Sequence, residues 1–426
     1  MPAQAGIQLR RVWTRSGFQS SWASWEGQGG VALVGRGSIL SLLNKRAEKI
    51  SILLHFALID DPMHILHVVG ARPNLVKAAP LLKALTGYDD ITQTLVHTGQ
   101  HYDANMSDVF FQQLRMPEPD VNLGVGSGSQ AQQTATVMQR FEPVVLEHKP
   151  DLVLVYGDVN STMATTVVCA KLLIPVGHVE AGLRSFDRTM PEEINRLLTD
   201  QVASLLFTPS TDADENLLRE GVAQDKIAFV GNVMIDSLVH LLPLADSSSI
   251  LTALDLQPQH YGLVTLHRPS NVDDPAMLAA IMEALNNISR DVVLLFPVHP
   301  RTRKQFELFD IVRPATKVRL IDPLSYLPFL ALQRSAALVI TDSGGVQEET
   351  TYLGVPCLTV RENTERPVTV TIGTNILVGR NMQLLQTHAA HILTGKGKQS
   401  QVPPLWDGHT SERIAKVIRA WRSHTD

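Results

Sequence analysis

The sequence predicts an α/β protein made of two Rossmann-like domains that face each other across a cleft. The chain has 426 residues, of which 44% are hydrophobic, and this length favours two domains over one. From residue 63 onward, short runs of β-branched residues alternate with amphipathic stretches, which is typical of βαβ units on a parallel sheet. Because open α/β sheets bind ligands beyond the carboxyl ends of their strands, two such halves predict a ligand held between them.

The expected strands fall into two series. The first series comprises residues 64–69, 91–97, 151–156, 175–179 and 226–230. The second series comprises residues 261–266, 291–298, 317–321, 337–341, 355–360 and 375–378. A helical stretch and a Ser-rich segment, residues 233–258, separate the series and mark the interdomain connection. The predicted domains therefore span residues 63–235 and 236–426, and the last helix, residues 409–424, fits against the first domain as well as the second.

The first 62 residues differ from the rest of the chain. Gly, Ser, Trp and Arg are scattered over residues 1–37 without helical or strand periodicity, which predicts disorder. The apolar stretch 50–59 is too short to span a bilayer, and no small-residue cleavage site follows it. We therefore interpret residues 1–62 as a non-essential extension and Met63 as an alternative start. We expect a cytoplasmic protein with no membrane partner.

Composition narrows the classes of function. The formal net charge is −5 and charges of both signs are mixed along the chain, so the basic surface that nucleic-acid binding needs is not expected. Cys169 and Cys357 are far apart and each lies in an apolar run, so they do not form a thiolate metal site. We expect two buried, reduced thiols, as in a reducing compartment, and neither a metal nor a cofactor.

One glycine-rich segment is a candidate phosphate site. The segment TDSGGVQEET, residues 341–350, follows an expected strand and begins a helix with Ser343, Gly344 and Gly345. Free N–H groups and the positive helix end suit a phosphate there, and Glu349, about one turn further in, is placed to reach a ribose. An ordinary Ser-capped helix start explains the segment equally well. Arg361 and Arg366 favour the phosphate, because guanidinium groups pair bidentately with diphosphates.

Three successive elements of the first domain each bring a carboxylate to the same end of the sheet. Asp158 follows a strand in YGDVNST, Glu180 ends a strand in HVEAGLR, and Glu192 begins a helix in MPEEINR. Crowded carboxylates can serve as acid and base near neutral pH, and Arg184 adds a nearby cation. Taken singly, Asp158 is as readily a helix cap, and Glu192 a partner of the helix dipole. His178 shares a strand face with Glu180, but no nearby pattern completes a metal ligand set.

Three basic or titratable residues complete the candidate site. Arg72 lies at the turn after the first strand in GARPNLVKAAP, and Lys77 follows in the same motif. Both can face a phosphate or a developing oxyanion, although a basic pair at such a place is usually solvated surface. His267, in TLHRPSN, ends the first strand of the second domain and is placed to face the acids. A single histidine there is more often structural.

Together these motifs resemble the non-hydrolysing UDP-N-acetylglucosamine 2-epimerases, a family with a glycosyltransferase B-like (GT-B-like) fold. The resemblance runs from Met63 to the C-terminus and also includes PVHPRTR, DPLSYLPFLAL and RENTERP. Several long motifs in one order over both halves make the match specific. The resemblance implies that residues 63–235 carry the catalytic carboxylates and that residues 236–426 bind UDP.

The resemblance and the local patterns together give a set of site residues. The expected catalytic residues are Asp158, Glu180, Glu192 and His267. The expected substrate-binding residues are Arg72, Lys77, Arg184, Phe329, Ser343, Gly344, Gly345, Glu349 and Arg366. Phe329 matches the position where the family packs the uracil ring, and Glu349 the position where it binds the ribose.

The resemblance also implies a reaction. UDP-N-acetylglucosamine (UDP-GlcNAc) and UDP-N-acetylmannosamine (UDP-ManNAc) interconvert by anti elimination of UDP and its re-addition to a 2-acetamidoglucal. The family works without a cofactor, in polysaccharide biosynthesis, and the resemblance implies a homodimer. The chemistry fits the acids, because the C2 hydrogen is barely acidic and departure of UDP must run ahead of proton removal, with carboxylates stabilising the charge at C1.

Two motifs depart from the family pattern. The chain reads HRPS at residues 267–270 where many members read HRRE, and GARPN at residues 70–74 where many read GTRPE. Pro269 and Ser270 remove a cation and an acid, which argues against a second UDP-sugar bound as an effector. The same departure leaves open a modified sugar, such as a diacetamido uronic acid.

Two other classes of protein stay open at this point. A UDP-sugar glycosyltransferase explains the UDP site equally well but the three converging carboxylates less well. A regulator that only binds a nucleotide sugar explains the motifs least well, because binding alone does not require several carboxylates at the sugar end.

Overall fold

The first of two parallel sheets is built around strand β1. The computed structural model describes residues 62–100, 114, 116–311 and 317–425, and within them the first sheet has seven strands in the order β3-β2-β1-β4-β5-β6-β7. These strands are β1 (Met63–Val69), β2 (Ile91–His97), β3 (Val121–Asn122), β4 (Leu152–Tyr156), β5 (Val176–Val179), β6 (Leu205–Thr208) and β7 (Ile227–Phe229). The helices between them are α2 (Arg72–Leu85), α4 (Gln130–His148), α5 (Asn160–Lys171), α6 (Pro191–Val202) and α7 (Thr211–Arg219). The predicted extension, residues 1–62, lies outside the described residues except for Pro62.

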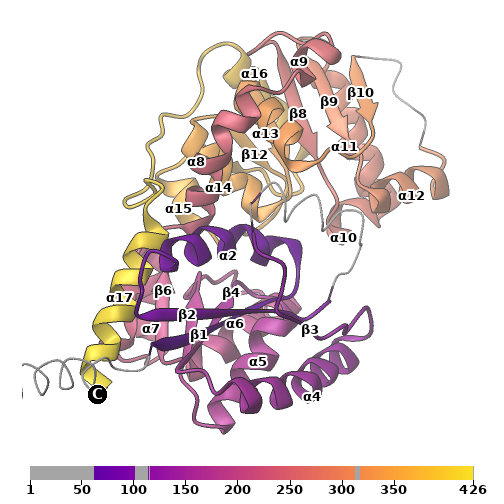
Figure 1. Cartoon of the computed structure of the whole chain (residues 1–426). Coiled ribbons are helices and arrows are strands. Elements are labelled where there is room, and N and C mark those ends of the chain that lie inside the picture. Colours follow the sequence, from indigo (N-terminus) through magenta and orange to yellow (C-terminus); the bar gives the residue numbers. More distant parts are fainter. Residues whose placement is uncertain (1–61, 101–113, 115, 312–316, 426) are drawn as a thin grey trace, which may run out of the picture. The chain divides into compact units, whose positions relative to one another are not determined.

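The second sheet repeats this plan. It has six strands among the described residues, in the order β10-β9-β8-β11-β12-β13. These strands are β8 (Tyr261–Thr265), β9 (Val293–Pro297), β10 (Val318–Ile321), β11 (Leu338–Thr341), β12 (Cys357–Thr359) and β13 (Asn375–Leu377). Its helices are α10 (Pro269–Val272), α11 (Pro275–Ile288), α12 (Pro300–Leu308), α13 (Tyr326–Ser335), α14 (Gly344–Leu353), α15 (Pro367–Thr371) and α16 (Met382–Leu393). Two parallel α/β sheets confirm the predicted fold class (Figure 1).

Both sheets have a switch point, where the strand order changes direction. β1 pairs with β2 on one side and with β4 on the other, and β8 pairs likewise with β9 and β11. Crossover helices leave opposite faces of the sheet on the two sides of such a point, so a crevice opens beyond the carboxyl ends of the strands. The expected acids follow β4 and β5, and the expected phosphate site follows β11.

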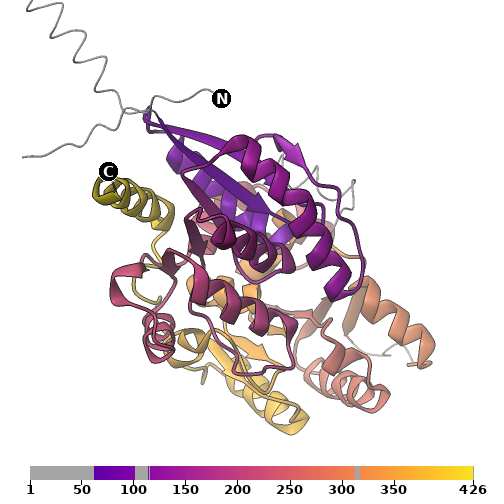
Figure 2. The same ribbon diagram turned by 90° about the horizontal axis from the view of Figure 1, so that it is seen from below.

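Three helices join the two halves. Helix α8 (Val233–Asp246) packs against α2 of the first half and against α13 and α14 of the second, and α9 (Ile250–Ala253) follows it. The last helix, α17 (Thr410–Thr425), contacts α2 and α8, and Figures 1 and 2 both show it, in yellow, beside the first half. The predicted domain boundary, between residues 235 and 236, falls inside α8. Because α8 packs against helices of both halves, the domain limits stay a prediction.

The expected strands all overlap observed ones. The prediction omitted β3, which is two residues long, and β6, whose sequence LLFT is buried throughout. A four-residue apolar run has no period that separates a buried strand from a helix segment, and β6 follows α6 after only Ala203 and Ser204. No helix in the described part of the chain combines the length and the hydropathy that a membrane span requires.

Candidate active site

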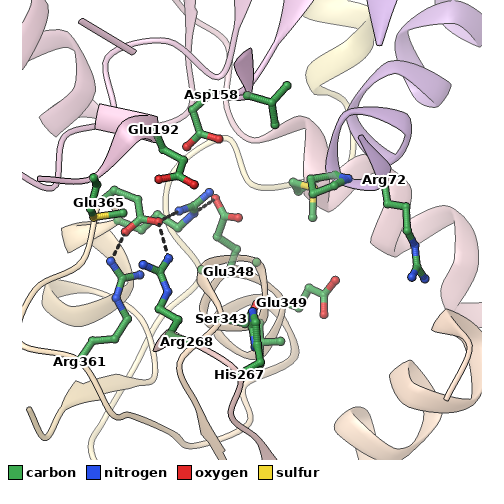
Figure 3. Close-up of a pocket in the computed structure, with 18 of the residues that line it drawn as sticks. Arg72, Asp158, Glu192, His267, Arg268, Ser343, Glu348, Glu349, Arg361 and Glu365 are labelled. Carbon is green, nitrogen blue, oxygen red and sulfur yellow. Dashed lines mark hydrogen bonds and ion pairs between the residues drawn. The ribbon is translucent and has the colours of Figure 1, made fainter. Parts of the chain in front are cut away.

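A cavity of about 1200 Å³ lies where the carboxyl ends of both sheets meet (Figure 3). Its wall includes residues that follow β1, β4, β8 and β11, as the switch points predict. Most of the expected site residues line it: Arg72, Lys77, Asp158, Glu192, His267, Phe329, Ser343, Gly344, Gly345, Glu349 and Arg366. Glu180 and Arg184 are not part of the wall. The structure therefore brings residues of both halves into one site.

Asp158 is held at the cavity by Arg196. β4 ends at Tyr156, the next residue has a φ of +62°, and a Cβ at Gly157 would lie 2.7 Å from the Nζ atom of Lys77. Glycine is therefore needed for the turn and for the close approach of Lys77. The guanidinium of Arg196 forms an ion pair with Asp158, while the Asp158 side chain remains 26% exposed to solvent. Asp158 thus presents a partly solvated carboxylate to the cavity.

Glu180 lies behind two cations of the cavity wall. Its buried carboxylate forms an ion pair with Lys77, and its Oε1 lies 3.1 Å from Nη2 of Arg366. Burial alone favours the neutral acid, but the charges of Lys77 and Arg366 outweigh it and hold the pKa of Glu180 below its ordinary value. The backbone at Glu180 is left-handed, with φ of +75°, which is uncommon outside glycine and is often found at functional sites.

The two neighbouring acids of α6 differ in their surroundings. Glu192 is exposed and lines the cavity. Glu193 is buried and accepts hydrogen bonds from the backbone N–H groups of Ser185, at 3.0 Å, and Phe186, at 2.9 Å. Glu193 therefore fixes the loop before α6, and Glu192 is the acid left for a ligand.

Arg184 serves the first half of the molecule rather than the cavity. Its guanidinium lies 2.7 Å from Asp200 and 2.7 Å from Glu220, and its side chain is buried. Asp200 also lies 2.6 Å from Nδ1 of His178, whose Nε2 donates to the carbonyl of Gly157 at 2.8 Å. The position of Arg184 thus gives no support to its expected role in substrate binding. Within the described residues, no three His, Cys, Asp or Glu side chains are grouped to hold a metal ion.

The N-terminus of α14 opens on the cavity. Ser343 occupies the N-cap position, and the ten-residue helix begins at Gly344. A Cβ at Gly344 would lie 2.6 Å from Arg366 Nη1, so glycine lets the guanidinium approach the first turn. The first backbone N–H groups of a helix have no partner within it, and together with Arg366 they form a site for an anion.

Arg366 is surrounded by carboxylates that sequence reasoning missed. Its guanidinium lies 2.8 Å from Glu365 and 2.9 Å from Glu348, besides the contact with Glu180. Glu365 also lies 2.8 Å from Arg361, and Figure 3 marks this ion pair. Burial opposes ionisation of Glu365, but the charges of Arg366 and Arg361 lower its pKa far below the usual range. Glu348 and Glu365 stand next to expected residues in VQEE and TERP, and this adjacency was the only local signal for them.

Glu349 has a different environment on the same helix. Its Oε1 accepts a hydrogen bond of 2.8 Å from the hydroxyl of Tyr326, and the residue is buried. Burial raises the pKa of Glu349 to about 7, against a smaller opposing effect of the Tyr326 hydrogen bond. Phe329 and Leu324 line the cavity together with Tyr326, so this end combines aromatic and apolar surface with one acid.

His267 lies at the end of β8 and is held by Asp342. Its Nδ1 lies 3.1 Å from Asp342 Oδ1, and the ring remains 39% exposed. The imidazole of His299 lies close to it, with 5.3 Å between the ring centroids. Both rings line the cavity.

Comparison with known proteins gives consistent matches. The profile of a family described as UDP-N-acetylglucosamine 2-epimerase matches residues 83–419. A UDP-N-acetylglucosamine 2-epimerase of Methanocaldococcus jannaschii is 44% identical over 359 residues, which cover 82% of this chain and 97% of the relative. A UDP-2,3-diacetamido-2,3-dideoxy-D-glucuronate 2-epimerase of Pseudomonas aeruginosa is 43% identical over 359 residues, 84% of this chain and 99% of the relative.

Solved structures agree with this result. The crystal structure of the Methanocaldococcus jannaschii UDP-GlcNAc 2-epimerase in complex with UDP-GlcNAc and UDP has a TM-score of 0.77 at 42% identity, and the match covers 84% of this chain and 100% of that one. A lipopolysaccharide outer core galactosyltransferase has a TM-score of 0.50 at 13% identity over 84% of this chain and 100% of that one. The second match concerns the fold alone and supports a GT-B-like arrangement.

Proposed function

Because the chain belongs to the UDP-N-acetylglucosamine 2-epimerase family of isomerases, we propose that it interconverts UDP-GlcNAc and UDP-ManNAc. One observation carries the proposal: a single cavity joins an anion site, formed by the α14 N-terminus and Arg366, to the carboxylates of Asp158 and Glu192. A protein that only binds a nucleotide sugar needs the first of these features but not the second.

The cavity offers a place for each part of a UDP-sugar. The diphosphate would lie against the N-terminus of α14 and Arg366, where N–H groups and a guanidinium meet. The uracil would pack on Phe329, and the ribose would bind Glu349, which burial keeps largely neutral below pH 7 and thus able to donate a hydrogen bond. The sugar would then extend toward Asp158 and Glu192.

The proposed reaction is an anti elimination of UDP, followed by re-addition of UDP with C2 protonated from the opposite face. The bond from C1 to the UDP oxygen breaks first, with both electrons leaving on UDP, and positive charge develops at C1. A carboxylate takes the proton from C2, the C1–C2 double bond forms, and the 2-acetamidoglucal remains beside UDP. Protonation of C2 from the opposite face and return of UDP to C1 give the epimer.

The three carboxylates differ in how directly they can reach the hydrogen at C2 of the sugar. Asp158 and Glu192 line the cavity, whereas Glu180 lies behind Lys77 and Arg366. A diphosphate that attracts these two cations would weaken their hold on Glu180 and make it a stronger base. All three therefore stay in the proposal, together with His267 near the leaving group.

A second candidate substrate is a diacetamido uronic acid on UDP. The Pseudomonas aeruginosa relative, named for that activity, is almost as similar to this chain as the Methanocaldococcus jannaschii one. The same elimination applies to both sugars, because neither a carboxylate at C6 nor an acetamido group at C3 takes part in it. Substrate comparison will decide between them.

Hydrogen exchange at C2 tests the proposal. Incubation with UDP-GlcNAc in heavy water, without an acceptor, should give UDP-ManNAc carrying deuterium at C2, and recovered substrate should acquire deuterium too. Asp158→Asn should slow exchange by about 10² to 10⁴, the usual contribution of a general acid or base, while UDP binding stays nearly unchanged. Glu142→Gln, the same kind of change at an exposed acid on α4, is the control.

The outcomes separate the classes of protein. Protium retained at C2 after long incubation with folded protein removes the epimerase proposal for UDP-GlcNAc. Exchange seen only with UDP-2,3-diacetamido-2,3-dideoxy-D-glucuronate identifies the second substrate. A glycosyltransferase would leave the C2 hydrogen in place with either sugar.

We further propose a cytoplasmic homodimer, on the basis of the family resemblance. Cell fractionation and sedimentation equilibrium check these two points.

Pro269 and Ser270 line the cavity beside His267, where many family members have an arginine and a glutamate. Because both charged side chains are replaced, we infer that no second UDP-sugar binds here as an effector. A sigmoidal dependence of rate on UDP-GlcNAc concentration would contradict that inference.

A further inference from the structure

Asp342 is a buried carboxylate at which the ends of β8 and β11 meet. The residue has no exposed surface and does not line the cavity. Its Oδ2 accepts the backbone N–H groups of His267, at 3.0 Å, and Arg268, at 2.9 Å. It also accepts from the side-chain amide of Asn271 at 3.1 Å. The carboxylate thus organises the turn that presents His267 to the cavity.

The same carboxylate lies beside one ring nitrogen of His267 and favours a proton on it. Asp342 Oδ1 lies 3.1 Å from Nδ1 of His267. Burial favours the neutral form of Asp342, but the hydrogen bond and the charge of His267 outweigh it and lower the pKa of Asp342. An ionised carboxylate only accepts hydrogen bonds, so Nδ1 of His267 must be the donor. Nε2 is then the ring nitrogen that remains for a ligand.

The place of Asp342 links this histidine to the anion site. Asp342 directly precedes Ser343, the N-cap residue of α14. A single residue therefore ties the imidazole of His267 to the helix end where the diphosphate is proposed to bind. The guanidinium of Arg268 is fixed to the same residue, because its Nε donates to the Asp342 carbonyl at 3.1 Å.

We propose that Asp342 is a positioning residue of the epimerisation site, which orients His267 and keeps its Nδ1 protonated so that Nε2 faces the departing UDP. This inference rests on the proposed function. When the ring carries a proton on both nitrogens, Nε2 can donate a hydrogen bond to the diphosphate as its charge grows. Asp342 itself does not line the cavity.

The second histidine of the cavity is His299, which lies beside His267. Burial, followed by the charges of His267 and Arg301, lowers the pKa of His299, and the charge of Asp342 only partly offsets this. Of these two neighbouring imidazoles, His267 is the one that contacts the buried carboxylate directly. Two cations lie in the same corner and have partners of their own. Arg268 donates to the Asp342 carbonyl and lies 3.8 Å from Glu365, and Arg301 pairs with Asp273.

Nitrogen NMR of the wild-type protein tests the tautomer without reference to activity. In protein labelled with ¹⁵N-histidine, the His267 signals, identified by their loss in His267→Ala, should show Nδ1 protonated when the ring is neutral. In Asp342→Asn the amide group can donate to Nδ1, and the Nε2-protonated tautomer should appear. A neutral wild-type ring protonated on Nε2 would overturn the proposal even if Asp342→Asn failed to fold.

Kinetics test whether Asp342 acts through His267. Asp342→Asn should lower kcat for epimerisation by about 10-fold to 100-fold, part of the full contribution of an acid or base, with a smaller change in KM. In the His267→Ala background the same substitution should lower kcat by less than about threefold, because the residue through which it acts is gone. A full additional loss in the double variant would show a general structural role instead.

Asp236→Asn is the matched control. Asp236 is likewise a buried carboxylate that accepts backbone N–H groups, from Thr410 at 3.0 Å and Ser411 at 2.6 Å. Among the described residues it has no histidine partner, and it lies outside the cavity wall. It should lower the melting temperature as Asp342→Asn does, yet leave kcat and the His267 tautomer unchanged. Failure of the proposed function appears differently, as absence of epimerisation by the wild-type protein with either sugar.

Discussion

At the scale of single residues, the carboxyl groups of the cavity are distinguished by their partners. Glu180 and Glu365 each contact two cations, so both stay ionised although they are buried. Glu348 contacts Arg366 but stands close to Glu180, and burial together with that negative charge raises its pKa. Glu349 contacts a phenol instead of a cation. Acids that look equivalent in the sequence therefore differ in the charge that they bring to a ligand.

Glu349 should make stability depend on pH. Its pKa in the folded protein is about 7 against an ordinary value of 4.5, so the folded state binds the proton more tightly than the unfolded state does. Stability contributed by this group is therefore complete below pH 4.5 and is lost as pH rises toward 7. Glu349→Gln, which resembles the neutral acid, should gain on the order of 3 kcal/mol over the wild type between pH 5 and pH 8.

Urea denaturation of both proteins at pH 5 and pH 8 measures this effect. A stability difference between Glu349→Gln and wild type that is the same at both pH values would contradict the prediction. Glu142→Gln, at an exposed position on α4, is the control and should show no such trend.

At the scale of elements, the last helix of the chain, α17, packs on the first half of the molecule and on α8. α17 contacts α2 and α8, and its Ile414, Ala415 and Ile418 are fully buried. These residues belong to a hydrophobic core that also includes Leu75 of α2 and Leu238 of α8. The last helix thus covers surface of the first half and closes the chain back on it.

Truncation of one α17 side chain should test this packing. Ile418→Ala should reduce the free energy of unfolding by about 2 to 5 kcal/mol, because it leaves a cavity in the core. Lys416→Ala, at an exposed position on the same helix, should change it by less than about 0.5 kcal/mol. Chemical denaturation compares the two, and equal stabilities would show that α17 does not belong to the core.

At the scale of the whole molecule, the site needs both halves at once. Arg366 of the second half contacts Glu180 of the first, across 186 residues of sequence. The cavity wall likewise combines Asp158 and Glu192 with His267 and Ser343. Neither half alone supplies both an anion site and the acids.

The N-terminal extension should be dispensable for this arrangement. Both sheets and the described wall of the cavity are formed by residues from Met63 onward. A shortened chain of residues 63–426 should therefore keep its kcat within about tenfold of the full chain, which corresponds to about 1.4 kcal/mol. Steady-state assays and thermal melts of the two chains check this, and a larger loss would assign the first 62 residues a part in folding or catalysis.

The sequence by itself determined the α/β class, nearly all strands and the motifs around the cavity, because strand periodicity and turn chemistry are local. Only the tertiary structure placed Arg184 with Asp200 and Glu220, and Glu180 behind Lys77 and Arg366. It also singled out residues that no motif rule selects, Glu348, Glu365 and Asp342. Their partners lie on other elements, and the balance of burial and charge that sets each pKa exists only once those elements pack together.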